Sequence, residues 1–144
     1  MNIEFETFIS QNEQDTADFA KKIAEMVSPG TVIALYGNLG AGKTVFSRSF
    51  AKAIGVKENV SSPTYTIIQE YKLDGQFSYL YHLDLYRINN SRDALAFAVD
   101  EYLNDRNSYS LVEWPERIED ILPPDTIKIM IEHQTDGSRK IYKL

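Results

Sequence analysis

A glycine-rich segment between two apolar segments is the feature that most constrains how this chain can fold. Gly37-Asn38-Leu39-Gly40-Ala41-Gly42-Lys43-Thr44 matches the pattern G-x-x-x-x-G-K-[ST] in full. Residues 31–36, directly before it, form an apolar run typical of a central strand that is covered on both faces. From Lys43 to about Ile54 the apolar residues recur at helical spacing. A strand, a tight glycine turn and a helix in this order predict a site for the phosphates of a nucleoside triphosphate.

The residue types of this segment, which we call the Gly37–Thr44 loop, suit the binding of phosphate and Mg²⁺. Gly37, Gly40 and Gly42 leave room for successive backbone N–H groups to turn inward and bind an anion. Lys43 can reach the β- and γ-phosphates, and the Thr44 hydroxyl can ligate a Mg²⁺ ion that bridges them. The sequence contains no N-K-x-D or T-K-x-D segment, with which translational GTPases read guanine. ATP is therefore favoured over GTP.

Composition restricts the class of protein further. The 144 residues predict a single domain over 1–144, and the absence of cysteine excludes disulfides, thiolate catalysis and the common structural zinc sites. The N-terminus lacks the pattern of a signal peptide, and no apolar run approaches the roughly 20 residues that span a bilayer. We therefore expect a cytoplasmic protein. The formal net charge of −6 argues against broad electrostatic capture of nucleic acid, which needs a basic face.

The remaining periodicity predicts an α/β fold. Asn12 with Asp15 forms a capping box at the start of a helix whose apolar stripe reaches Val27. Asp74-Gly75 and Asp136-Gly137 each separate two strand-like runs and predict hairpins. We predict strands at 3–9, 31–36, 65–73, 77–86, 108–114, 126–133 and 141–144, helices at 12–27, 43–54 and 90–103, and a short helix or turn at 115–122. This order predicts a P-loop NTPase-like three-layer sandwich, whose central mixed sheet has a parallel core and antiparallel hairpin additions.

Two acidic residues are candidates to complete the site. Glu113 ends the apolar run 110–113, where P-loop enzymes carry a carboxylate that holds Mg²⁺; the alternative is a solvated acid at a strand end. Asp84 lies in an aromatic-rich strand, where burial of an acid is costly unless it is paired or catalytic. Arg87 could simply neutralise it. Trp114 follows Glu113, and a tryptophan there is more often part of a core or an interface than of the chemistry.

Three blocks in this order and spacing resemble one family. They are the Gly37–Thr44 loop, Ser62-Pro63-Thr64-Tyr65-Thr66 with Glu70-Tyr71, and His82-Leu83-Asp84-Leu85-Tyr86-Arg87 followed by Leu111-Val112-Glu113-Trp114-Pro115. Together they resemble the TsaE (YjeE) family, the ATPase subunit of the bacterial machinery for tRNA threonylcarbamoyladenosine. The resemblance implies an ATP-hydrolysing protein that acts with two partners, TsaB and TsaD, and meets tRNA indirectly through that complex.

The resemblance also implies roles for single residues. Lys43 and the surrounding loop backbone would hold phosphate, and Thr44 and Glu113 would be ligands of Mg²⁺. Asp84 would position or activate the attacking water. Further positions are implied by the family pattern: Ser62, Pro63 and Thr64 as a switch-like loop near the γ-phosphate, Trp114 close to the site, and Asn12, Glu13 and Arg139 on the adenine side.

Other functions are compatible with the same loop. A small P-loop kinase for a metabolite or cell-wall precursor is the main alternative, and a nucleotide-gated interaction module without an enzymatic role is another. The chain is short for a kinase, which usually carries lid or substrate-binding insertions. Arg87, Arg117 and Arg139 are isolated candidates for an arginine finger. We therefore expect an ATPase that is weak in isolation and is completed by its partners.

Overall fold

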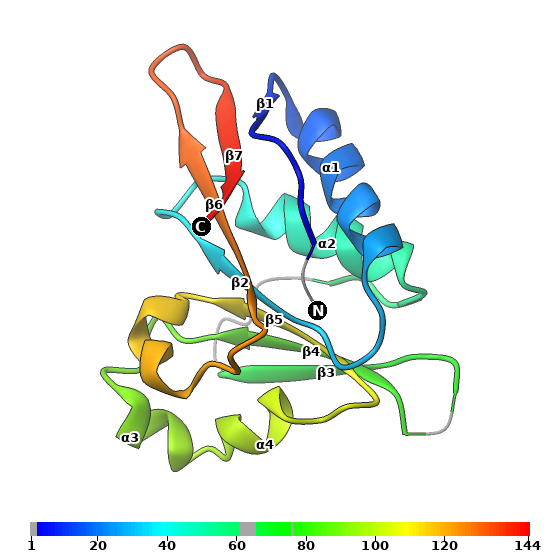
Figure 1. Ribbon diagram of the computed structural model, residues 1–144, viewed down its shortest axis with the longest axis vertical. Coiled ribbons are helices and arrows are strands. Elements are labelled where there is room, and N and C mark those ends of the chain that lie inside the picture. The colour runs from blue at the N-terminus through cyan, green and yellow to red at the C-terminus, as the bar shows by residue number, and fades with distance from the viewer. Residues whose placement is uncertain (1–2, 61–65, 76) are drawn as a thin grey trace.

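The computed structural model of the protein describes residues 3–60, 66–75 and 77–144, and its seven strands form one sheet (Figure 1). In chain order the elements are β1 (Phe8–Ser10), α1 (Glu13–Met26), β2 (Val32–Tyr36), α2 (Lys43–Ala53), β3 (Ile68–Lys72), β4 (Tyr79–Asp84), α3 (Ser91–Leu95), α4 (Val99–Leu103), β5 (Tyr109–Glu113), the 3₁₀ helix Pro115–Ile121, β6 (Ile127–His133) and β7 (Arg139–Lys143). Their order in the sheet is β1-β7-β6-β2-β5-β4-β3.

The four central strands are parallel and the edges are antiparallel. β6, β2, β5 and β4 run in the same direction, whereas β7 and β1 at one edge and β3 at the other run against their neighbours. This arrangement confirms the predicted α/β fold with a parallel core and hairpin additions. Because parallel strands end at the same edge, the residue pairs Leu35–Glu113 and Asp84–Glu113 lie beside each other where β2, β4 and β5 finish.

Helices cover both faces of the sheet, which confirms the three layers. Figure 1 shows α1 and α2 on one side of the sheet and α3 and α4 on the other. Phe46 and Phe50 of α2 are fully buried in the first core, and Leu83 and Val99 are fully buried in the second. The longest of these helices, α1, has 14 residues. In the described part of the chain, no helix is long and apolar enough to cross a membrane.

The first helix begins as its sequence predicts. The Asn12 side chain accepts a hydrogen bond from the Asp15 amide (2.9 Å), and the Asp15 carboxylate accepts one from the Gln11 amide (2.8 Å). Each carboxyl or amide side chain thus satisfies a backbone N–H group that has no partner within the helix. Ala20, Ile23 and Ala24 on the apolar face of this helix are buried as expected. The helix ends at Met26, so Val27 lies beyond it and is only partly buried.

Two predicted elements are longer than the ones that the structure contains. The predicted strand 3–9 is reduced to β1, since only Phe8–Ser10 has a partner strand, β7. The predicted helix 90–103 is two short helices, α3 and α4, separated by Ala98 in the left-handed region (φ 59°). This break allows Ala94 and Val99 to be buried together while Leu95 and Phe97 remain exposed.

The two predicted hairpins form with shifted ends. At the first, β3 ends at Lys72 and β4 begins at Tyr79, so the connection is longer than the Asp74-Gly75 pair alone. At the second, β7 already begins at Arg139, because Gln134 and Ser138 close the Asp136-Gly137 turn with a backbone hydrogen bond of 2.8 Å. The earlier start of β7 brings Arg139 next to the end of β6.

One glycine of the loop is required by close backbone approach. Gly37 follows β2 directly and has φ +146°, and a Cβ atom built there would lie 2.6 Å from the Ile131 carbonyl oxygen of β6. Gly40 also has positive φ (+80°), but nothing lies within 4 Å of the corresponding position. At Gly37 the loop therefore passes so close to the backbone of β6 that no side chain fits there.

Gly37→Ala is expected to lower the free energy of unfolding by about 3 kcal/mol or more, because the added methyl group forces the loop and β6 apart in addition to the backbone strain. Gly40→Ala serves as the matched control and should cost only about 1 kcal/mol, since it adds strain without a clash. Urea unfolding of both variants measures the difference. Equal losses would contradict the steric role of Gly37.

Candidate active site

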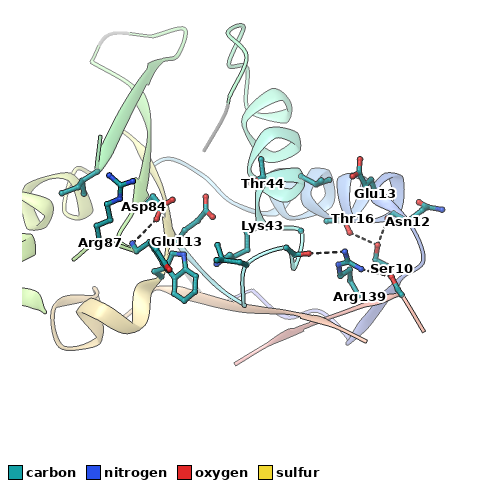
Figure 2. Close-up of a pocket in the computed structure, with 18 of the residues that line it drawn as sticks. Ser10, Asn12, Glu13, Thr16, Lys43, Thr44, Asp84, Arg87, Glu113 and Arg139 are labelled. Atoms are coloured by element: carbon teal, nitrogen blue, oxygen red, sulfur yellow. Dashed lines mark hydrogen bonds between the residues drawn. The ribbon is translucent and has the colours of Figure 1, made fainter. Parts of the chain in front are cut away.

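A cavity of about 610 Å³ lies at the edge of the sheet where the parallel strands end. Its walls come from the start of α1, the Gly37–Thr44 loop, the ends of β4 and β5 and the β6–β7 turn. The polar residues that line it are Ser10, Asn12, Glu13, Thr16, Lys43, Thr44, Thr66, Asp84, Tyr86, Arg87, Glu113 and Arg139. Figure 2 shows Lys43 and Thr44 between two groups, with Asp84, Arg87 and Glu113 on one side and Asn12, Glu13 and Arg139 on the other.

The loop delivers the beginning of α2 to this cavity. Gly42 precedes the helix with φ 107°, a left-handed conformation that glycine adopts without steric cost, and no side chain caps the helix there. Lys43, Thr44 and Val45 of the first turn all line the cavity. The first N–H groups of a helix lack partners within the helix and carry partial positive charge, so this end of α2 is suited to an anion.

Lys43 is a buried cation at the centre of the site. Its side chain is only 5% exposed, and its Nζ donates to the Gly37 carbonyl oxygen (2.6 Å) and lies 4.1 Å from the centroid of the Trp114 ring. Burial lowers the pKa of Lys43, and the nearby carboxylates of Glu113, Glu116 and Asp84 oppose that shift. The contact with Trp114 is a cation–π interaction, which places the indole within the site.

Glu113 is buried and paired rather than a solvated acid at a strand end. It is 4% exposed, and its Oε2 accepts a hydrogen bond from His82 Nε2 (2.5 Å). Among the residues that the structure describes, Glu113 has no ion pair with Lys43 within 4 Å, although both line the cavity. The carboxylate is thus held inside the protein by its histidine neighbour.

Asp84 is the second carboxylate at this edge. It is half-buried, and its Oδ1 accepts from the Tyr86 amide (3.1 Å). Burial raises the pKa of Asp84; the Tyr86 amide lowers it, and the charge of Glu113 adds to the increase. Arg87 lines the same cavity but, within the described residues, forms no ion pair with Asp84 within 4 Å. Simple neutralisation by Arg87 is therefore not what keeps Asp84 at this position.

Arg139 contacts the loop from the other side. Its guanidinium donates to the carbonyl oxygens of Ala41 (2.9 Å), Gly40 (3.2 Å) and Gly137 (2.8 Å). Nearby, the hydroxyls of Ser10 and Thr16 share a hydrogen bond of 2.7 Å. Arg139 at the start of β7 thus contacts the loop, and the start of α1 lines the same cavity although it is far from β7 in the sequence.

The donor set at this edge fits Mg²⁺. In the described part of the chain, no group of three or more histidine or acidic residues could hold a metal by itself. Mg²⁺ at a phosphate site needs fewer protein ligands, because it keeps several waters and takes oxygens from the phosphates. The Thr44 hydroxyl and the carboxylates of Glu113 and Asp84 line one cavity and are oxygen donors of the kind that Mg²⁺ prefers.

The structure brings together most of the predicted site residues. Asn12, Glu13, Leu39, Gly40, Gly42, Lys43, Thr44, Asp84, Glu113, Trp114 and Arg139 all line the cavity. Gly37, Asn38 and Ala41 belong to the loop but do not line the cavity, and Ser62, Pro63 and Thr64 lie outside the described residues. Sequence reasoning gave no role to Ser10, Thr16 and Tyr86, which also line the cavity. The signals available were proximity in the chain to Asn12 for the first two and membership of the His82–Arg87 block for Tyr86.

The fold and the loop define an α/β protein of the P-loop type. The sequence profile of one family, described as "Threonylcarbamoyl adenosine biosynthesis protein TsaE", matches residues 10–141. This chain belongs to the TsaE family.

Curated relatives and a solved structure agree with this assignment. The tRNA threonylcarbamoyladenosine biosynthesis protein TsaE of Bacillus subtilis is 42% identical over 130 residues, which cover 90% of this chain and 79% of that protein. The protein of the same name from Treponema pallidum is 33% identical, with coverage of 92% and 96%. The crystal structure of YdiB from Bacillus subtilis superimposes with a TM-score of 0.76 at 36% identity and covers 96% of this chain and 83% of that one.

Asp84→Asn is expected to raise the free energy of unfolding at neutral pH when Mg²⁺ and nucleotide are absent. Because the pKa of Asp84 is raised in the folded protein, its ionised form destabilises the fold above that pKa. The penalty disappears as the pH falls below the unfolded value, where the carboxyl group is protonated in both states. Asparagine keeps the acceptor for the Tyr86 amide. Urea unfolding in EDTA at about pH 7 and about pH 3 should show a gain at the higher pH only.

Glu58→Gln, at an exposed position, provides the control and should change stability by less than about 0.5 kcal/mol at either pH. An Asp84→Asn variant no more stable than the parent at pH 7 would show that burial of this carboxylate carries no penalty.

Proposed function

We propose that this protein is an ATP-binding and ATP-hydrolysing subunit that is required for threonylcarbamoyl modification of the adenosine next to the anticodon in tRNA. The observation that supports the proposal best is one cavity that contains a helix N-terminus, the buried Lys43 and, on one side of it, the carboxylates of Asp84 and Glu113. Phosphoryl transfer to water is mostly positioning and stabilisation of charge, and these groups supply both. The family to which the chain belongs supports the link to tRNA.

ATP would lie along the length of the cavity, with its phosphates at the Gly37–Thr44 loop. The volume of about 610 Å³ is typical of a site for a small molecule of this kind. Lys43 would exchange the Gly37 carbonyl for phosphate oxygens, which compensate its charge better. The base would extend towards Asn12, Glu13 and Arg139, on the side of the loop away from Asp84 and Glu113.

Thr44 and Glu113 would hold Mg²⁺, which when bound neutralises charge on the phosphate oxygens. The chain's own residues then have separate tasks. Asp84 would orient the attacking water and accept its proton, and a raised pKa brings a carboxylate closer to the operating pH of a general base. Trp114, which lies over Lys43, would exclude water from the cationic centre.

Partner proteins would complete the enzyme. Arg139 is engaged by carbonyl oxygens of the loop, and the Arg117 guanidinium lies 6.0 Å from the Trp114 ring centroid. Of the three arginine candidates, Arg87 lines the cavity beside Asp84 without pairing with it. We propose that hydrolysis is slow in isolation, that TsaB and TsaD accelerate it, and that they hold the tRNA, since this chain carries a net charge of −6. A cytoplasmic location stays a prediction.

Lys43→Ala should weaken ATP binding about 10- to 100-fold, because a charge-assisted hydrogen bond to phosphate is lost. Calorimetric titration measures the affinity, and Lys52→Ala, an exposed lysine in the last turn of α2, is the matched control. ATP should also change the fluorescence of Trp114, the only tryptophan of the chain, because it draws Lys43 away from the indole. Unchanged affinity for ATP in Lys43→Ala would contradict the proposal that the Gly37–Thr44 loop binds its phosphates.

Asp84→Asn should keep ATP binding and lose about 10²- to 10⁴-fold in hydrolysis, because the water-orienting base is missing. Release of inorganic phosphate is measured with TsaB, TsaD and tRNA present, together with the number of modified tRNA molecules per complex. Phosphorylation of a small acceptor instead of phosphate release would favour the kinase alternative. Multiple-turnover tRNA modification that is unaffected by Asp84→Asn would favour a nucleotide-gated module without a need for hydrolysis.

A further inference from the structure

His82 is a buried polar residue to which the proposed reaction assigns no role. It lies in the middle of β4 and is 0% exposed. It is not among the residues that line the cavity, so it cannot meet ATP or the attacking water there. Histidine is costly to bury completely unless its ring nitrogens are engaged, so its position requires a reason.

Within the described residues, the one hydrogen bond of its side chain leads to the site. His82 Nε2 lies 2.5 Å from Oε2 of Glu113, and both side chains are almost fully buried. In the parallel register His82 is opposite Leu111, and Glu113 follows two residues later on the same face of β5. The histidine therefore lies behind Glu113, one step further from the cavity than the carboxylate itself.

The other ring nitrogen indicates which atom carries the hydrogen. His82 Nδ1 is buried and has no hydrogen-bond partner in the described part of the chain. A buried N–H group without an acceptor is costly and rare, whereas an unpaired lone pair is tolerated more often. The hydrogen therefore belongs on Nε2, where the carboxylate accepts it.

We propose that His82 is a positioning residue that orients the Glu113 carboxylate for Mg²⁺, an inference that rests on the proposed function. A glutamate has several rotatable bonds, and a ligand that must be immobilised on binding loses affinity through that lost freedom. The hydrogen bond to Oε2 restricts the carboxylate before the metal arrives. Removal of such a supporting partner costs about 10- to 100-fold in metal affinity in comparable sites.

Other roles of His82 predict other effects of substitution on Mg²⁺ binding. If His82 only filled space, leucine, which has a similar volume, would replace it without effect on the metal. If only a polar group were required, glutamine and asparagine would serve equally. Only the positioning role depends on reach, because the amide nitrogen of glutamine extends towards the place of Nε2 and that of asparagine does not.

The test compares His82→Gln, His82→Asn and His82→Leu in the full chain. The readout is the Mg²⁺ concentration that gives half of the Mg²⁺-dependent gain in ATP affinity, together with ATP affinity in EDTA. We expect the Asn and Leu variants to need about 10- to 100-fold more Mg²⁺ and the Gln variant to stay within about threefold of the parent. Binding of ATP in EDTA should be unchanged in all three.

Two controls separate positioning from loss of stability. Tyr81→Phe removes a hydrogen bond to Asp105 (2.6 Å) from the neighbouring residue of the same strand and should leave the Mg²⁺ requirement unchanged. In a Glu113→Gln background, His82→Leu should have no further effect on that requirement, because the group it orients is gone. If His82→Leu does not fold, the difference in Mg²⁺ requirement between His82→Gln and His82→Asn decides the question.

The inference fails if the Asn and Leu variants keep the parental Mg²⁺ requirement, or if their ATP affinity falls equally in EDTA and in Mg²⁺. These outcomes differ from failure of the proposed function. A parent protein that binds no ATP in either condition would remove the proposed function itself. A parent that binds ATP in a Mg²⁺-dependent way, with variants that do not differ from it, would remove only the role of His82.

Discussion

The parallel hydrogen bonding of β2, β5 and β4 is the constraint on which the site depends. Leu35 lies opposite Glu113 and Glu113 lies opposite Asp84, so the strand that continues into the Gly37–Thr44 loop and the two strands that end in carboxylates finish at one edge. Because successive residues of a strand point to opposite faces, a slip of one residue would turn a carboxylate away from the loop. The register that buries the core thus also determines which charged groups meet.

That edge concentrates charge where the protein is poorly solvated. Lys43 and Glu113 are both almost fully buried, and isolated charges in such places are very costly. Each is compensated locally, the lysine by the Gly37 carbonyl and the Trp114 ring, and the glutamate by His82. The two apolar cores on opposite faces of the sheet supply the stability that such a site requires.

Local signals in the sequence predicted the elements whose structure depends on their own residues. The cap at Asn12 and the glycine-rich loop are found as predicted, and the apolar strand predicted at 31–36 is found at Val32–Tyr36. Capping, burial on both faces and tight turns need particular residue types at particular places. The strand at 3–9 and the helix at 90–103 were predicted too long, since a strand requires a partner and Ala98 turns the chain between two helices. The sequence also marked Asp84 and Glu113 but not the neighbour that each would have.

The sequence by itself determined the loop, its residue types and the family, because these depend on a short motif and on spacing along the chain. Only the tertiary structure decided that His82 pairs with Glu113, that Arg139 reaches the carbonyl oxygens of Gly40 and Ala41, and that Trp114 covers Lys43. These contacts join residues from different strands and turns. The order of strands in the sheet sets their distances, and no pattern along the chain records that order.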